Sequence, residues 1–87
     1  MTAPSDEIGV RVLFFGVYGE MAGERERPFR LPVGSSVADL VEAVRALPGF
    51  DWLPERPVAA VNRSYADAGT TLADGDDVAL IPPVAGG

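Results

Sequence analysis

An amphipathic helix is predicted by the stretch Val37-Ala38-Asp39-Leu40-Val41-Glu42-Ala43-Val44-Arg45-Ala46-Leu47. Its apolar residues recur at helical spacing and share one face, while Asp39, Glu42 and Arg45 point away from it: Val37, Leu40, Val41, Val44 and Leu47. Ser36 followed three residues later by Asp39 has the spacing of a capping box, and Pro48-Gly49 ends the helix. The apolar face must therefore pack against the rest of the chain.

Short apolar runs on both sides of this helix predict a sheet. Val10–Phe15 and Asp77–Ile81 are rich in β-branched and aromatic residues, and their nearly continuous apolar pattern predicts neighbouring central strands buried on both faces. Arg27–Leu31 alternates in polarity and contains a proline, which favours an edge strand. Val58–Val61 predicts a further strand, and Ser64-Tyr65 a brief one.

This order of elements predicts an α+β fold of the ubiquitin-like β-grasp type, a mixed sheet of four to five strands with one main helix packed across it. The 87 residues suffice for one domain with one modest core. We assign residues 9–81 to this domain, residues 1–8 to a disordered lead-in and residues 82–87 to a flexible tail.

The connecting segments are predicted to be irregular. Residues 16–24 mix glycine and charge, which indicates a loop, and in residues 50–57 Trp52 and Leu53 are expected to cover the end of the core. Asp74-Gly75-Asp76 is a turn signal. Its carboxylates also suit an acid/base pair or a metal site, but aspartate favours such positions for local backbone hydrogen bonds, which is the interpretation we prefer.

The composition excludes most self-contained catalysis. The chain has no Cys, which removes thiolate nucleophiles, persulfides and thiolate metal sites, and no His, the commonest general base and metal ligand. It also has no Lys, so no side-chain amine exists for a Schiff base or an isopeptide bond. We expect neither a metal site nor a bound cofactor.

The chain is acidic, with 13 Asp and Glu against 7 Arg and a net charge of −6. This charge would repel phosphate backbones and argues against nucleic-acid binding. It suits docking onto a basic partner, or it simply maintains solubility. No apolar run is long enough to cross a membrane, and Met1 to Gly9 lacks the features of a signal peptide, so we expect a cytoplasmic protein with no membrane partner.

The last residues are Pro82-Pro83-Val84-Ala85-Gly86-Gly87. Proline cannot donate to a sheet ladder and ends the preceding strand. Gly86 and Gly87 lack a β-carbon, so the tail can enter a slot too narrow for other backbones. The pattern indicates a protein whose working group is its C-terminal carboxylate, although an ordinary frayed terminus would also be rich in glycine.

Residues 10–87 resemble the small subunit of molybdopterin synthase, the MoaD-type sulfur carrier. Four strings carry the resemblance: Leu13-Phe14-Phe15-Gly16, Ala59-Ala60-Val61-Asn62, Leu72-Ala73-Asp74-Gly75-Asp76-Asp77-Val78-Ala79 and Pro82-Pro83-Val84-Ala85-Gly86-Gly87. Many members carry an Arg before the Glu that follows the first strand, where this chain has Gly19 before Glu20. The contact made by that Arg is therefore not implied here.

The resemblance implies a mechanism in which the chain is a co-substrate. An E1-like adenylyltransferase would use ATP to convert the Gly87 carboxylate to an acyl-adenylate, and sulfur from a donor protein would replace AMP to leave a thiocarboxylate. The tail would then deliver this sulfur to cyclic pyranopterin monophosphate in the large subunit, in a two-plus-two heterotetramer. Two such turnovers build the dithiolene of molybdopterin, and the catalytic side chains belong to the partners.

By the same resemblance, Phe15, Tyr65 and Ile81 match family positions that form an apolar patch beside the tail and dock on both partners. Core packing is an equal alternative for Phe15 and Ile81. Arg11 and Arg63 are either contacts to partner acids or solvated surface charges, of which we prefer the latter.

Three other functions remain open. The first is a thiocarboxylate carrier for thiamine-thiazole or another sulfur pathway, although the Leu-Phe-Phe and Pro-Pro-Val strings favour the molybdopterin family. The second is a ubiquitin-like protein modifier joined to targets through Gly87. The third is a non-covalent β-grasp interaction module, which would not need Gly86-Gly87.

Overall fold

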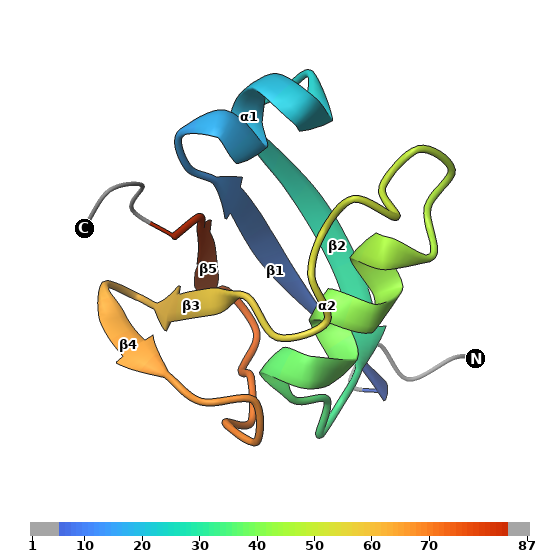
Figure 1. Ribbon diagram of the computed structural model, residues 1–87. Coiled ribbons are helices and arrows are strands. Elements are labelled where there is room, and N and C mark those ends of the chain that lie inside the picture. Colours follow the sequence, from blue (N-terminus) through green and yellow to red (C-terminus); the bar gives the residue numbers. More distant parts are fainter. Residues whose placement is uncertain (1–5, 84–87) are drawn as a thin grey trace.

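The computed structural model describes residues 6–83 as a five-stranded sheet with two helices (Figure 1). In chain order the elements are β1 (Glu7–Phe14), α1 (Val17–Ala22), β2 (Glu26–Pro32), α2 (Val37–Arg45), β3 (Val58–Val61), β4 (Ser64–Ala66) and β5 (Asp77–Ile81). The strand order across the sheet is β2-β1-β5-β3-β4. β1 and β5 pair in parallel and the other neighbours are antiparallel, so the sheet is mixed and the predicted β-grasp fold is confirmed.

α2 begins at the predicted capping box. The Ser36 hydroxyl accepts a hydrogen bond from the Asp39 amide at 3.2 Å, and the Asp39 carboxylate accepts one from the Ser36 amide at 2.9 Å. Four residues of the predicted apolar face are buried against the sheet: Val37, Leu40, Val41 and Val44. Each such side chain contributes about 1.5–3 kcal/mol by leaving water. Figure 1 shows α2 lying across the sheet, as predicted.

The central strands β1 and β5 are neighbours, but β1 is not buried on both faces as its sequence predicted. Its residues alternate, with Val12 and Phe14 buried towards α2 while Arg11 is exposed and Leu13 half-buried on the opposite face. No described helix covers that second face of β1. The long apolar run therefore supplies the core on one side and an apolar surface on the other.

The N-terminal boundary and the first connection also differ from prediction. β1 begins at Glu7, because Glu7 pairs with Pro32 at the end of the seven-residue β2. The lead-in therefore ends earlier than residue 8, and residues 1–5 lie outside the described part of the chain. The predicted loop over residues 16–24 contains α1 instead, whose Tyr18 is buried in the core.

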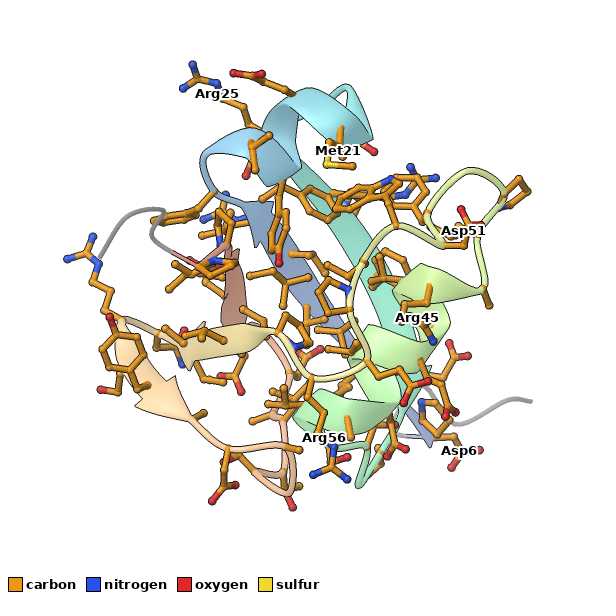
Figure 2. The ribbon with its side chains drawn as sticks, in the orientation of Figure 1. Asp6, Met21, Arg25, Arg45, Asp51 and Arg56 are labelled. Atoms are coloured by element: carbon orange, nitrogen blue, oxygen red, sulfur yellow. The ribbon has the colours of Figure 1, made fainter. Side chains whose placement is uncertain are left out.

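The segment after α2 closes one end of the core. Leu53 is buried, and the Trp52 ring packs 5.5 Å from that of Tyr18 and 5.8 Å from that of Phe50, measured between ring centroids. This confirms the predicted cap. Arg45, labelled in Figure 2, ties this segment to α2, because its Nε donates a 2.6 Å hydrogen bond to the Leu53 carbonyl.

Candidate functional site

The face of the sheet opposite α2 carries an apolar depression. Strand register puts its residues in rows: Leu13 pairs with Ala79, Ala79 with Ala60, and Ala60 with Tyr65. One row further on, Ile81 lies opposite Val58, and Phe15 follows directly after β1. We call this surface the open-face depression, and its apolar lining is Leu13, Phe15, Ala60, Tyr65, Ala79 and Ile81.

The structure brings the three predicted partner-binding residues together in this depression. Phe15 is 48% exposed and Tyr65 is 81% exposed, while Ile81 is half-buried. Neither Phe15 nor Ile81 belongs to the buried core, so the alternative of core packing does not describe them. Their role in binding a partner stays a prediction.

The chain leaves the sheet beside this depression. Pro82 follows Ile81 directly and is half-buried, and Pro83 is exposed. Gly16 lies against Pro82, because a β-carbon on Gly16 would be 3.3 Å from Pro82 Cγ. Of the predicted tail, Val84, Ala85, Gly86 and Gly87 lie outside the described residues.

Four polar side chains complete the lining of the open-face depression, and three of them bond to neighbours. Arg11 forms a bidentate pair with Asp77 at 3.0 and 3.1 Å and contacts Glu26 at 3.1 Å. These contacts raise the pKa of the Arg11 guanidinium, chiefly through the hydrogen bond to Asp77. Asn62 is also engaged, because its amide nitrogen donates to Asp76 and its amide oxygen accepts from the Asp77 backbone amide, both at 2.9 Å.

The fourth polar residue, Arg63, has no ion pair or hydrogen-bonded side chain among the described residues. It is exposed and has a positive φ of 76°. The sequence placed Arg63 in a turn but carried no signal that its side chain would be uncommitted.

Both aspartates of the Asp74-Gly75-Asp76 turn accept backbone hydrogen bonds, but only that of Asp76 is local as predicted, because Asp74 bonds to β1. Asp74 accepts a 2.7 Å hydrogen bond from the Gly9 amide, and Asp76 accepts one of 2.8 Å from the Ala73 amide. Across residues 6–83, no three acidic, His or Cys side chains gather into a group that could hold a metal ion. Neither described helix is long and apolar enough to cross a membrane.

The described residues thus form an apolar surface at whose edge Pro82 and Pro83 leave the last strand, with the nearby carboxylates occupied in turns and ion pairs. Residues 12–87 match the ThiS family. The chain belongs to the ThiS family. This agrees with the β-grasp topology and with the position of Pro82-Pro83 at the end of the last strand.

Relatives of this ThiS-family chain align with most of its length. It is 39% identical to the molybdopterin synthase sulfur carrier subunit of Mycobacterium tuberculosis, covering 92% of this chain and 99% of the relative. It is 37% identical to the protein of the same name from Chlamydomonas reinhardtii, covering 90% and 98%.

Solved structures of similar fold include molybdopterin converting factor subunits and an archaeal modifier protein. A putative molybdopterin converting factor subunit 1 from Pyrococcus furiosus is 31% identical with a TM-score of 0.76, covering 88% of this chain and 99% of the other. The small archaeal modifier protein 1 of Haloferax volcanii is 27% identical with a TM-score of 0.77, with coverage of 88% and 99%. A chain from the complex of subunits 1 and 2 of the Helicobacter pylori molybdopterin-converting factor is 28% identical with a TM-score of 0.64, covering 92% and 100%.

Gly19, where many molybdopterin carriers have Arg, lies in α1 against the end of β1. A β-carbon there would be 3.1 Å from the Phe14 carbonyl oxygen, closer than most side chains tolerate. In this ThiS-family chain the local backbone is therefore adapted to glycine, and an Arg at this position would require a shift of α1 or β1.

Proposed function

We infer that this chain is the sulfur carrier subunit of molybdopterin synthase and acts in molybdenum cofactor biosynthesis. One observation carries this inference: relatives bearing that name are 37–39% identical to it and align along nearly their full length. The family match extends over residues 12–87 and therefore includes the C-terminal Gly-Gly.

The site supports a carrier that works through its tail. Ile81, Pro82 and Pro83 lead the chain out from the edge of the open-face depression. A partner that covers Phe15, Tyr65 and Ile81 would therefore hold the carrier by its apolar face, next to the point from which the tail enters the partner's active site. Aromatic residues exposed on such a patch are typical anchors of a protein interface.

The chemistry requires activation because a free α-carboxylate, whose reference pKa is roughly 3.3–3.7, is ionised and unreactive near neutral pH. Its oxygen attacks the α-phosphate of ATP in an adenylyltransferase and releases pyrophosphate. The outer sulfur of a persulfide on the donor protein then attacks the acyl carbon and AMP leaves, and a thiol reduces the resulting acyl disulfide, which breaks its S–S bond and yields the thiocarboxylate. When that sulfur passes to cyclic pyranopterin monophosphate, water supplies the oxygen that restores the carboxylate. The partners supply the catalytic side chains and the ATP site, and this chain binds no cofactor of its own.

The partners in this scheme are proteins. The Helicobacter pylori complex of subunits 1 and 2 supports the large subunit of molybdopterin synthase as a partner. The two-plus-two assembly with that subunit is part of the proposal. The E1-like adenylyltransferase and the sulfur donor follow from the chemistry. Because adenylation consumes ATP, we place the chain in the cytoplasm.

The test is the intact mass of the protein after incubation with adenylyltransferase, ATP and a sulfur source from its own organism. We expect a gain equal to replacing one oxygen by sulfur, localised to Gly87. Deleting Gly87, or adding one residue after it, should abolish the gain and leave the thermal midpoint unchanged. Sulfur transfer by either variant would contradict the function.

A second pair of variants tests access to the tail. Gly86→Val should block adenylation, because a branched side chain does not fit a slot built for glycine. Gly69→Val is the matched control: a β-carbon at Gly69 comes no closer than 3.8 Å to another group, so adenylation should be normal. Normal adenylation of the Gly86→Val protein would refute the narrow-slot argument.

The modifier function is the second candidate, because the Haloferax volcanii small archaeal modifier protein 1 has the same fold at 27% identity. Isopeptide conjugates of Gly87 with other proteins in cells would favour it. A thiocarboxylate that serves thiazole synthesis in place of molybdopterin would point to the other sulfur pathway. If the protein binds partners equally well without Gly86-Gly87, it is a non-covalent interaction module.

A further inference from the structure

The turn between β3 and β4 contains an unusual residue. Val61 pairs with Ser64, so Asn62 and Arg63 form a two-residue hairpin loop in which both have positive φ, 50° and 76°. Two positive φ angles define a type I′ turn, in which Asn suits the first position and Gly the second. Arg63 thus occupies a conformation that glycine adopts at lower cost.

Hydrogen bonds within the fold explain why Asn62 occupies this turn, whereas no contact with a described residue explains Arg63. Asn62 ties the turn to the start of β5, because its side chain bonds Asp76 and the Asp77 amide and its own amide donates to the Asp77 carbonyl at 2.8 Å. Arg63 makes no such contact with a described residue and is exposed. A strained residue that the scaffold does not use indicates a role outside the folded chain.

The position of Arg63 indicates where that role lies. It lines the open-face depression, where Arg11 and Asp77 already neutralise each other, so Arg63 is the one charged residue of that lining without a partner among the described residues. Arg25 and Arg56 also lack ion pairs with described residues, but neither lines this depression nor has a positive φ, and Figure 2 shows both pointing outward.

A protein seated on the apolar lining would remove water from the rim that carries Arg63. Covering a guanidinium without an anionic partner is costly, whereas a carboxylate placed opposite satisfies it with directional hydrogen bonds. The carrier has a net charge of −6, so a positive group at the depression is a distinctive feature of its surface. A partner carboxylate would meet this group in only one docking orientation, which favours that orientation over others.

We propose that Arg63 forms an ion pair with a carboxylate of the synthase large subunit, and that this pair sets the orientation in which the carrier docks and its tail enters. The proposal rests on the proposed function. Arg63 is a positioning residue, since it acts on the tail through the geometry of docking.

The test compares binding of the purified large subunit to the full-length carrier and its variants. Arg63→Gly should weaken binding about tenfold through faster dissociation, and Arg63→Glu should weaken it further. Arg63→Lys should retain part of the affinity, and Arg56→Ala should bind like the wild type. Arg63→Gly also makes the carrier more negative by one charge. If only long-range attraction to a basic partner mattered, this variant would associate faster than the wild type and would not bind more weakly.

Stability separates this role from a structural one. Because glycine fits the turn, the thermal midpoint of Arg63→Gly should equal or exceed that of the wild type. Weaker binding accompanied by a lower midpoint would assign Arg63 to the hairpin and overturn the proposal.

Two further outcomes keep the hypotheses distinct. If the wild type does not bind the large subunit, the proposed function fails and this inference fails with it. If the wild type binds and Arg63→Gly dissociates at the same rate, the inference alone is wrong. Reversal of one acidic residue on the large subunit that restores binding of Arg63→Glu would identify the partner carboxylate.

Discussion

Gly16 shows how one residue couples the scaffold to the tail. Its backbone lies at φ 53° and ψ −132°, a combination that is strained for any residue with a β-carbon. Pro82 packs on the same spot, 3.3 Å from where that β-carbon would be. The backbone conformation of residue 16 and its close contact with Pro82 are therefore two independent reasons why this position requires glycine.

We expect Gly16→Ala to lower the free energy of unfolding by about 1–3 kcal/mol, the cost of holding alanine in this region. It should also slow adenylation in the native protein, because Pro82 must shift. Urea unfolding and an adenylation assay measure the two effects. Gly69→Ala, at a site with ordinary φ and no close neighbour, should change stability by less than about 0.5 kcal/mol. Equal effects at both positions would contradict the argument.

At the scale of elements, α1 exists because of what it packs against. It has six residues, no side-chain cap and a glycine at its centre, and helices this short do not persist alone. Tyr18 supplies the missing stability, since its ring is buried and packs on Trp52. Burial also raises the pKa of the Tyr18 phenol, because the charged phenolate is poorly solvated there.

This pKa shift predicts a loss of stability in alkali. Above a pH of about 10 the unfolded chain releases the Tyr18 proton while the folded chain still holds it, so the unfolded state gains stability as pH rises. The stability that the protonated Tyr18 phenol contributes is fully present below that pH. It is lost as the pH rises through the pKa that Tyr18 has in the folded chain. The urea midpoint of Tyr18→Phe should therefore decline less above pH ~10 than that of the wild type. Tyr65→Phe, altered at an exposed ring, is the control and should follow the wild type.

At the scale of the whole molecule, net charge and surface shape make different contributions to binding. The open-face depression supplies apolar contact, and its Arg11–Asp77 pair is internally neutral. The chain as a whole has a net charge of −6, most of its acidic residues lie outside the depression, and this charge acts at a distance. Acidity therefore favours encounter with a basic partner, while the depression determines which surface docks.

Association with the large subunit should consequently slow as salt is added. Between low ionic strength and about 0.5 M salt, we expect the association rate constant to fall roughly tenfold and dissociation to change little. Stopped-flow mixing at several salt concentrations measures both. An association rate that does not depend on salt would mean that the acidic surface serves solubility alone.

Several structural features of this protein depend on residues that are close together in the sequence, and these features could be predicted from it. The capping box at Ser36 and the apolar face of α2 depend on contacts within four residues, so their spacing predicts them directly. The Asp74-Gly75-Asp76 turn and the Asp77–Ile81 strand are local in the same sense. The order of these elements was enough to predict a β-grasp.

Only the tertiary structure decided which face of an apolar strand is covered. Leu13, Phe15 and Ile81 are as apolar as core residues, and they are left on an open face because α2 packs against the opposite one. α1 likewise forms because Trp52, distant in sequence, packs on Tyr18. Arg63 has no partner among residues 6–83 because the neighbouring polar side chains pair with one another. Burial and pairing depend on which distant segments meet, whereas helix and turn signals depend on near neighbours.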